Sequence, residues 1–275
     1  MNPPICPLCK GTSFQPIFTV SGVDQYLNVL GISHGNLERS WLRCHECGHL
    51  SNSVRLELQE QRTLYQKFRD QEWRKESPDA YFNRITSLTP SESENYQKIE
   101  LIKRKLGIAP SDSRGKMIDI GCGGGVLIHT AKLVFGENWQ FFGVEPTESF
   151  ALLASRRTGA SVIAAEYHPG IFVNQQFDLA TCCQVLEHVE RPQEFLNGIR
   201  GDLKDGGNLY LEVPDISDFD SLERSHDRFM CQQFSYFSRS ILSTMLEHLR
   251  IIEVASGVTK TVRNRNNLWV IAQAT

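Results

Sequence analysis

The chain has 275 residues, a formal net charge of −3 and a pI near 6.3, and 40% of its residues are hydrophobic. This composition is that of a globular protein with room for one large domain, or for a medium and a small one. The slightly acidic balance argues against a general affinity for nucleic acid or for an anionic membrane surface. No apolar stretch is long enough to span a bilayer and no signal-peptide core opens the chain, which predicts a cytoplasmic protein without membrane insertion.

Paired cysteines mark the N-terminal segment. Four of the eight cysteines form two Cys-x-x-Cys pairs: Cys6, Cys9, Cys44 and Cys47. In a reducing compartment this spacing indicates a metal site, and four thiolates suit tetrahedral, structural Zn²⁺. His45 and His49 are close enough in sequence to be alternative ligands, and a redox pair or chance spacing is the competing explanation. We expect residues 1–55 to form a zinc-ribbon module, with strands at Ser13–Val20 and Arg39–Arg43 and a loop at Gly31–Asn36 between them.

Residues 56–112 are predicted to be a helical connector. A charged helix is expected over Leu56–Trp73, and Ser77-Pro78-Asp79 ends it. A second helix is expected around Ile99–Leu106, ahead of Gly107, and Ser91 with Glu94 would form its capping box. The simplest interpretation is a packing helix before the main domain. The alternative is a lid over a ligand, formed in part by Tyr81, Phe82 or Arg84.

The stretch Met117–Val126 reads MIDIGCGGGV, which combines a strand, a glycine-rich loop and the start of a helix. Glycine lets a ligand approach the backbone and permits a positive φ angle. The N–H groups at the start of the helix can donate to a carboxylate or a phosphate. The order of elements therefore predicts a nucleotide-type binding turn.

From residue 116 onward the pattern alternates between strand and helix, which indicates an open, mostly parallel sheet with helices on both faces. The predicted strands are Met117–Ile120, Gln140–Val144, Ser161–Ala165, Phe177–Cys183, Asn208–Val213, Arg250–Val254 and Leu268–Ala272. The predicted helices are Val126–Phe135, Glu148–Thr158, Pro192–Leu203 and Arg239–Leu249. We therefore expect residues 113–275 to form an α/β, Rossmann-like domain that binds its ligand at the carboxyl ends of the strands.

The glycine loop departs from the G-x-G-x-x-G pattern of nicotinamide dinucleotide sites, because Val126 stands where the third glycine should be. Asp119 precedes the first glycine by two residues, and Glu145 follows the next strand. A carboxylate at that strand end can accept from both hydroxyl groups of an unphosphorylated ribose. Dinucleotides and S-adenosylmethionine (SAM) can both provide such a ribose.

Five motifs in this order resemble those of class I SAM-dependent methyltransferases. They are IDIGCGGG at 118–125, FFGVEP at 141–146, FDLATCCQVLEHV at 177–189, LKDGGNLYLEVPD at 203–215 and FSYFSRSILSTMLEH at 234–248. With the cysteine pairs ahead of them, the chain is similar to bacterial methyltransferases of sugar, surface-glycan or secondary-metabolite pathways that carry an N-terminal zinc ribbon. The resemblance implies a class I methyltransferase sheet with a zinc-ribbon module, and SAM and Zn²⁺ as cofactors.

The resemblance also implies roles for single residues. Those implied in cofactor binding are Asp119, Gly121, Cys122, Gly123, Gly125, Glu145, Pro146, Glu166, Gln184 and Leu186. Glu145 would bind the ribose hydroxyl groups, Glu166 would lie near the adenine amino group, and Gln184 would face the methionine part. Glu166 could instead be a solvated surface charge, and Cys122, like Cys182 and Cys183, could be a small apolar filler.

A base is needed if the acceptor is a hydroxyl group, and histidine is the natural candidate near neutral pH. His188 and His226 follow the fourth and fifth strands on the expected acceptor side, and His188 is favoured. Glu187 or Asp215 could orient the histidine or accept the proton itself. His188 could also cap or pack on the following helix without taking part in the chemistry.

One departure from the family bears on the acceptor. Zinc-ribbon sugar C-methyltransferases typically carry a segment like His-Glu-His ahead of a Tyr-Phe pair, and Cys231, Gln232 and Gln233 stand there instead. The predicted function is therefore methyl transfer to a polar small-molecule or glycan acceptor. An oxygen (or nitrogen) acceptor atom is favoured over carbon, with O-methylation as the first choice. An RNA methyltransferase that grips RNA with its zinc module is an alternative, although the sequence has no long basic run. A non-catalytic SAM-binding scaffold protein is another.

Overall fold

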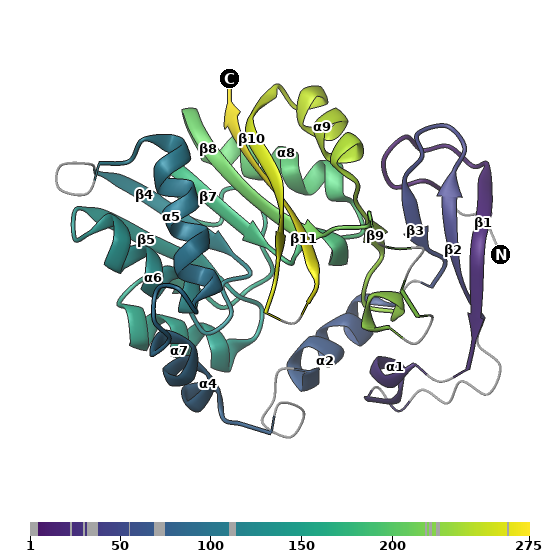
Figure 1. Cartoon of the computed structure of the whole chain (residues 1–275), viewed down its shortest axis with the longest axis horizontal. Coiled ribbons are helices and arrows are strands. Elements are labelled where there is room, and N and C mark those ends of the chain that lie inside the picture. The colour runs from purple at the N-terminus through teal and green to yellow at the C-terminus, as the bar shows by residue number, and fades with distance from the viewer. Residues whose placement is uncertain are drawn as a thin grey trace.

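The computed structural model describes residues 5–22, 24–29, 31, 38–54, 56–68, 75–109, 114–217, 219, 222–223, 226–262 and 264–275. Within these residues the chain forms a mixed sheet of seven strands and an antiparallel sheet of four strands. Figure 1 shows the large sheet with its helices beside the small N-terminal sheet. Of the helices in the described ranges, none has both the length and the apolar character needed to cross a lipid bilayer.

The large sheet has the strand order β10-β11-β8-β7-β4-β5-β6. Its strands are β4 (Gly115–Ile120), β5 (Trp139–Val144), β6 (Ser161–Ile163), β7 (Phe177–Cys183), β8 (Leu203–Pro214), β10 (Ile251–Lys260) and β11 (Asn266–Ala274). Strands β4 to β8 pair in parallel, and β11 runs antiparallel to both of its neighbours. The predicted α/β fold is therefore confirmed, and the glycine loop follows β4, an inner strand between β7 and β5.

Helices cover both faces of this sheet. The helices of the main domain are α5 (Glu94–Leu106), α6 (Val126–Phe135), α7 (Glu148–Thr158), α8 (Pro192–Asp202) and α9 (Arg239–His248). Apolar residues of α5, α6 and α7 pack on one face, around Met117 and Leu179. Those of α8 and α9 pack on the other face, around Ile118 and Ala180. Successive strand residues thus enter opposite cores, as expected for a strand that is buried on both faces.

The connector differs from its prediction at two helix starts. Helix α5 is capped by Ser93, which accepts from the N–H of Tyr96 at 3.2 Å, so the predicted capping box of Ser91 and Glu94 is wrong. Since Glu94 is the first helical residue, the cap has to be the residue before it. Ser77 and Pro78, which were predicted to end a helix, open α4 (Pro78–Thr86), because a serine side chain caps a helix and proline suits its first turn. Helix α2 (Leu58–Phe68) lies within the predicted helix, whose residues 69–73 are outside the described residues.

The small sheet joins the N-terminal segment to the segment that follows β8. Its order is β1-β2-β3-β9, with β1 (Phe14–Ser21), β2 (Glu38–Cys44), β3 (Leu50–Asn52) and β9 (Ser235–Tyr236). Strand β9 belongs to the segment between β8 and α9, so this segment completes the N-terminal sheet. The short helix α1 (Gln25–Val29) lies between β1 and β2, and the predicted loop at 31–36 is outside the described residues except for Gly31.

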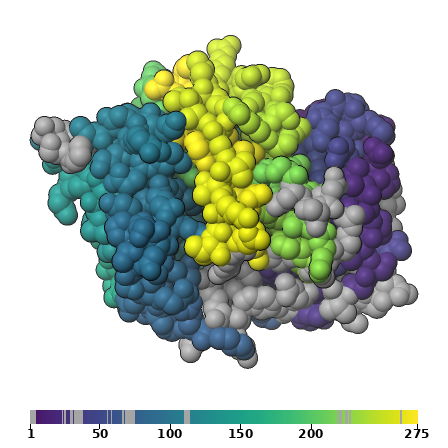
Figure 2. Space-filling model, in the orientation of Figure 1, coloured from purple at the N-terminus to yellow at the C-terminus, as the bar shows by residue number. Residues whose placement is uncertain are grey.

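Two apolar clusters fill the contact between the small sheet and the segment after β8. Trp41 and Leu50 pack against Phe229 and Tyr236 in one of them. In the other, Tyr26, Leu27 and Leu64 pack against Met230 and Phe234. Figure 2 shows the β10–β11 hairpin (yellow) between the helices of the main domain and this green segment, with the N-terminal strands beyond it.

Candidate functional site

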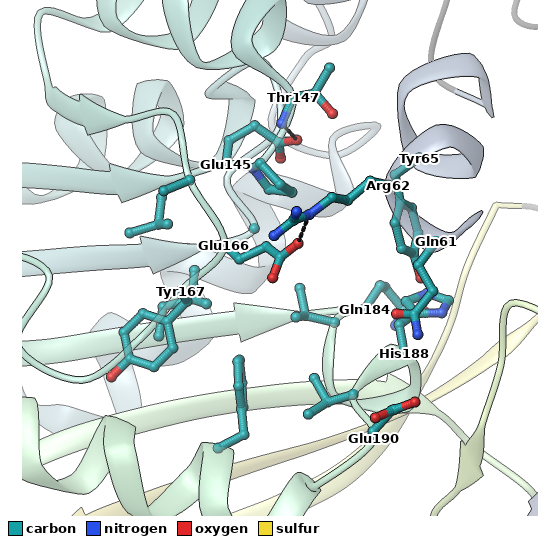
Figure 3. Close-up of a pocket in the computed structure, with 18 of the residues that line it drawn as sticks. Gln61, Arg62, Tyr65, Glu145, Thr147, Glu166, Tyr167, Gln184, His188 and Glu190 are labelled. Carbon is teal, nitrogen blue, oxygen red and sulfur yellow. Dashed lines mark hydrogen bonds and ion pairs between the residues drawn. The ribbon is translucent and has the colours of Figure 1, made fainter. Parts of the chain in front are cut away.

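A cavity of about 790 Å³ lies at the carboxyl ends of β4, β5 and β7 (Figure 3). Its wall includes the glycine loop, the ends of β5 and β6, the 3₁₀ turn η1 (Leu186–His188) and helix α2. A cavity of this size can enclose a small organic ligand. Its position at the carboxyl edge of a mostly parallel sheet is the one predicted from the alternation of strands and helices.

The glycine loop requires glycine for conformation and for packing. Gly121, Gly123 and Gly125 have φ angles of 74°, 54° and 84°. A Cβ atom on Gly121 would lie 2.5 Å from Cγ2 of Val185, and one on Gly125 would lie 2.9 Å from Cβ of Ala154. Side chains at these positions would therefore strain the backbone and collide with the protein itself. Gly121 lines the cavity directly.

Glu145 holds its carboxylate at the edge of the cavity. Its Oε2 accepts from the N–H of Gly123 at 2.9 Å, and its Oε1 accepts from the N–H of Thr147 at 3.0 Å. Each carboxylate oxygen has two lone pairs, so both can accept a further hydrogen bond from a ligand. The residue is 1% exposed and lines the cavity, which fits a carboxylate set to receive a pair of neighbouring hydroxyl groups.

Five residues predicted to bind the cofactor do not line the cavity: Gly123 and Gly125 in the glycine loop, and three buried residues behind the cavity wall. Asp119 is buried and accepts from Oγ1 of Thr181 at 2.7 Å. Burial raises the pKa of Asp119 to about 7, against the opposing effects of that hydrogen bond and of Lys98. Cys122 and Leu186 are buried as well, and neither is among the residues that line the cavity. These three residues can support the loop and η1 but do not face the cavity.

Pro146, Glu166 and Gln184 do line the cavity. Oε1 of Glu166 accepts from Nε of Arg62 at 2.7 Å, and the two side chains are 48% and 50% exposed. Figure 3 shows Arg62 reaching from α2 across the cavity to Glu166. The ion pair thus joins α2 to the segment that follows β6.

His188 lines the cavity, and a backbone carbonyl group fixes the orientation of its imidazole ring. Its Nδ1 lies 2.5 Å from the carbonyl oxygen of Gln232. A carbonyl oxygen can only accept, so this contact assigns a proton to Nδ1 and, in the neutral ring, leaves Nε2 as the basic nitrogen. The ring of Tyr65 meets the imidazole edge-on, with 5.6 Å between the ring centroids. This tautomer suits a group that takes up a proton at Nε2.

Glu187 lies beside the same imidazole but is buried. Its Oε1 is 3.9 Å from Nε2 of His188. Among the described residues its Oε2 has no hydrogen-bond partner, although the side chain is almost fully buried. Burial raises the pKa of Glu187 to about 8. The site therefore holds a carboxyl group that is partly protonated near neutral pH, next to an imidazole.

The two other acid–base candidates lie elsewhere. His226 caps the 3₁₀ turn η3 (Asp227–Phe229), where its Nδ1 accepts from the N–H of Arg228 at 3.2 Å, and it does not line the cavity. Asp215 accepts from the N–H and the hydroxyl group of Ser217. After β8 the chain turns toward the N-terminal sheet, which carries both residues away from the cavity.

Helix α2 and the two residues before it supply the part of the site that the sequence did not predict. Leu56, Glu57, Gln61, Arg62 and Tyr65 all line the cavity. The sequence predicts a charged helix here, and Leu64 is buried, but no motif shows what the polar side chains of this helix would meet. The alternative of a lid formed in part by Tyr81, Phe82 or Arg84 does not fit, because none of the three lines the cavity and Phe82 is buried against His129 of α6 and under Arg157 of α7.

The four paired cysteines converge as predicted. Their Sγ atoms all lie within 4.8 Å of one another, with Cys6 and Cys47 at 3.6 Å and Cys9 and Cys44 at 3.5 Å. Four sulfur atoms at about 2.3 Å from a tetrahedral ion would be about 3.8 Å apart, so the cluster fits a metal ion. His49 is buried with Nε2 3.2 Å from Oγ of Ser235, and it does not belong to the cluster.

Comparisons with known proteins agree with this geometry. Residues 118–209 match the family described as methyltransferase domain. The chain is 27% identical to the ubiquinone biosynthesis O-methyltransferase of Pseudomonas aeruginosa over 140 residues, which are 48% of this chain and 57% of that protein. It is 36% identical to the mitochondrial ubiquinone biosynthesis O-methyltransferase of Schizosaccharomyces pombe over 106 residues, 36% of this chain and 37% of that protein. The match thus spans 57% of the length of the first relative and 37% of the length of the second.

A solved structure shares the fold. The plantazolicin methyltransferase BpumL, solved in complex with SAH, superposes with a TM-score of 0.56 at 15% identity. The superposition covers 79% of this chain and 96% of that protein. It therefore extends the likeness well beyond residues 118–209, at the level of the fold.

Proposed function

We propose that this chain, a class I SAM-dependent methyltransferase with a four-cysteine cluster near its N-terminus, methylates a hydroxyl group of a polar small molecule or glycan. The observation that carries the proposal is that a single cavity holds both halves of the site. Gly121 and Glu145 line one part of it, and His188 lines another part. The similarity to ubiquinone biosynthesis O-methyltransferases supports oxygen as the acceptor atom. The absence of a His-Glu-His segment at residues 231–233 supports the same choice.

The residues at the glycine loop fit SAM. The carboxylate of Glu145 would accept from the ribose hydroxyl groups, since both of its oxygens are fixed by backbone N–H groups and keep lone pairs. Pro146 and Thr147 would border the adenine, and Gln184 would face the methionine part. When bound, SAM supplies a methyl group that its sulfonium centre already activates.

The chain's own residues would then position the acceptor and take its proton. His188 would accept the hydroxyl proton at Nε2, and the Gln232 carbonyl would stabilise the Nδ1–H of the charged ring. The carboxyl group of Glu187, 3.9 Å from that nitrogen, would offset the ring's positive charge whenever it is ionised. Alignment of the acceptor oxygen with the methyl group supplies much of the remaining rate enhancement.

We also propose Zn²⁺ as the ion of the cysteine cluster. Four thiolates complete a tetrahedral shell, and Zn²⁺ prefers such a shell in sites that stabilise a fold and take no part in chemistry. The sulfur–sulfur distances of 3.5 and 3.6 Å are close to those of such a site. Elemental analysis of the purified protein, with about one zinc ion expected per chain, checks this assignment.

The function is tested by screening hydroxylated acceptors with methyl-labelled SAM and locating the methyl group in the product by mass spectrometry. His188→Ala should lower kcat on the identified acceptor by about 10²- to 10⁴-fold, because a general base is lost. Its dissociation constant for SAM should not change. The matched control is His248→Ala, at the exposed end of α9, which should keep the wild-type rate.

Two results would contradict the proposal. Full activity of His188→Ala would exclude His188 as the base. A wild-type protein that binds SAM tightly but methylates no acceptor across the screen would favour the scaffold alternative.

A further inference from the structure

The N-terminal module, residues 1–55, is connected to the imidazole of His188 by hydrogen bonds to one turn, Met230–Gln233. We propose that Asp24 is a positioning residue for His188: it anchors the turn Met230–Gln233, whose Gln232 carbonyl orients the imidazole. The inference rests on the proposed function only in giving His188 the role of base. It also gives the N-terminal module a part in the site, although none of its residues from 5 to 54 lines the cavity where the structure describes them.

Asp24 is fully buried, and each of its two carboxylate oxygens accepts hydrogen bonds. Its Oδ1 caps α1 by accepting from the N–H of Tyr26 at 2.8 Å and of Leu27 at 3.3 Å. Its Oδ2 forms an ion pair with buried Arg39 of β2 and accepts from the N–H of Cys231 at 2.8 Å. A buried carboxylate held in this way cannot move without leaving buried donors unpaired, which is costly. Asp24 therefore fixes Cys231 relative to the small sheet.

The rest of the turn is held from the same side. The side-chain amide of Asn52 donates to the carbonyl oxygen of Met230 at 3.4 Å. The backbone N–H of Asn52 donates to the carbonyl oxygen of Phe234 at 3.0 Å. On its other side, the N–H of Phe234 donates to the carbonyl oxygen of Glu187 at 2.9 Å. The turn is thus clamped between β3 and η1, and Gln232 lies at its centre.

The position of the Gln232 carbonyl decides where the imidazole carries its proton. A neutral histidine in water prefers the proton on Nε2, and the 2.5 Å contact with a carbonyl oxygen reverses that preference. If the turn drifts, the Nδ1–H tautomer loses its support and Nε2 is protonated in a larger share of molecules. Such a ring cannot accept a proton at Nε2, and the orientation of the base is lost as well.

Asp24→Ser tests the inference. Serine keeps a good N-cap for α1, but its side chain is too short to reach Cys231 or Arg39. With ¹⁵N-labelled histidine and His188→Gln to assign the signals, NMR should find His188 in the Nδ1–H tautomer in the wild type. In Asp24→Ser the signals should shift toward the Nε2–H tautomer. The kcat on the acceptor should fall by about 10- to 100-fold with SAM affinity retained.

Two further variants keep the test decisive. The double variant Asp24→Ser/Arg39→Met removes the buried cation that the single variant leaves unpaired, so it should fold even if the single variant does not. Thr19→Val is the control, because it removes an exposed hydroxyl contact with Ser40 within the same sheet and should leave the tautomer unchanged. An unchanged His188 tautomer in either folded Asp24 variant overturns the inference. A tautomer shift together with full activity of His188→Ala supports the positioning role and overturns only the assignment of the base.

Discussion

At the scale of single residues, the burial of Glu187 should make the stability of the protein depend on pH. Burial raises the pKa of this carboxyl group from 4.5 to about 8. Between those values the folded state keeps a proton that the unfolded state has released, so the contribution of Glu187 to stability declines as the pH rises through this window. The pKa differs by 8 − 4.5 = 3.5 between the two states, and each pKa unit is worth about 1.36 kcal/mol. The free energy of unfolding can therefore fall by at most about 5 kcal/mol across this pH window.

Glu187→Gln should remove this dependence. We expect its free energy of unfolding, relative to the wild type, to increase between pH 4.5 and pH 8, with little change outside that window. Urea denaturation at a series of pH values measures the difference. Glu194→Gln, on the exposed start of α8, is the control and should follow the wild-type curve. Parallel curves for Glu187→Gln and the wild type would mean that Glu187 is not buried in its protonated form.

Single residues also show how far sequence reasoning reaches. The position of Glu145 could be predicted because it depends only on a strand end next to a glycine loop, and the structure places it at the cavity. His188 and His226 both follow strands of the same sheet, so local sequence favoured His188 but gave no ground to exclude His226. What separates them is the pairing of β9 with β3, a contact between residues nearly two hundred positions apart. Such a contact has no signature in either segment alone.

At the scale of elements, the close contact of α6 with α7 depends on Gly125. This residue has a φ angle of 84°, and an added Cβ would lie 2.9 Å from Cβ and 3.0 Å from Cα of Ala154. Gly125→Ala should therefore cost roughly 1–3 kcal/mol of stability, from backbone strain and from overpacking. Thermal or urea denaturation measures this loss.

The chain provides a matched control for that variant. Gly201 lies in α8 with open space around its missing Cβ, so Gly201→Ala should be neutral or stabilise by up to about 1 kcal/mol. If Gly125→Ala were as stable as Gly201→Ala, the packing of α6 on α7 would not require glycine.

Elements differ in how well their sequence defines them. The bounds of α6 and β7 agree with prediction, because a helical apolar stripe and a continuous apolar strand are strong local patterns. Helix α2 was predicted as a helix but not as a wall of the cavity. Its periodicity identifies the face that is buried, whereas the partner of the opposite face depends on how α2 crosses the sheet. The ion pair between Arg62 and Glu166 is a consequence of that crossing and could not be predicted.

At the scale of the whole molecule, the small and large sheets share one segment of chain. The predicted division into residues 1–55, 56–112 and 113–275 places β9 in the third unit, yet β9 completes the sheet of the first. Leu64 of the connector packs in the cluster that contains Tyr26 and Met230. Because all three units meet in these clusters, we expect the chain to unfold in one cooperative transition.

The cysteine cluster should therefore influence the distant cavity. Cys44 ends β2 and Cys47 lies just before β3, so an ion held there fixes the register of β3, which pairs with β9 close to Gln232. Removal of the proposed zinc ion should lower the melting temperature by roughly 5–15 °C in a single transition, because its binding energy would be part of the folding energy. Calorimetry before and after chelation measures this change, and restored Zn²⁺ should reverse it. Two separate transitions after chelation, with the methylation rate retained, would instead mean that the metal stabilises an independent module.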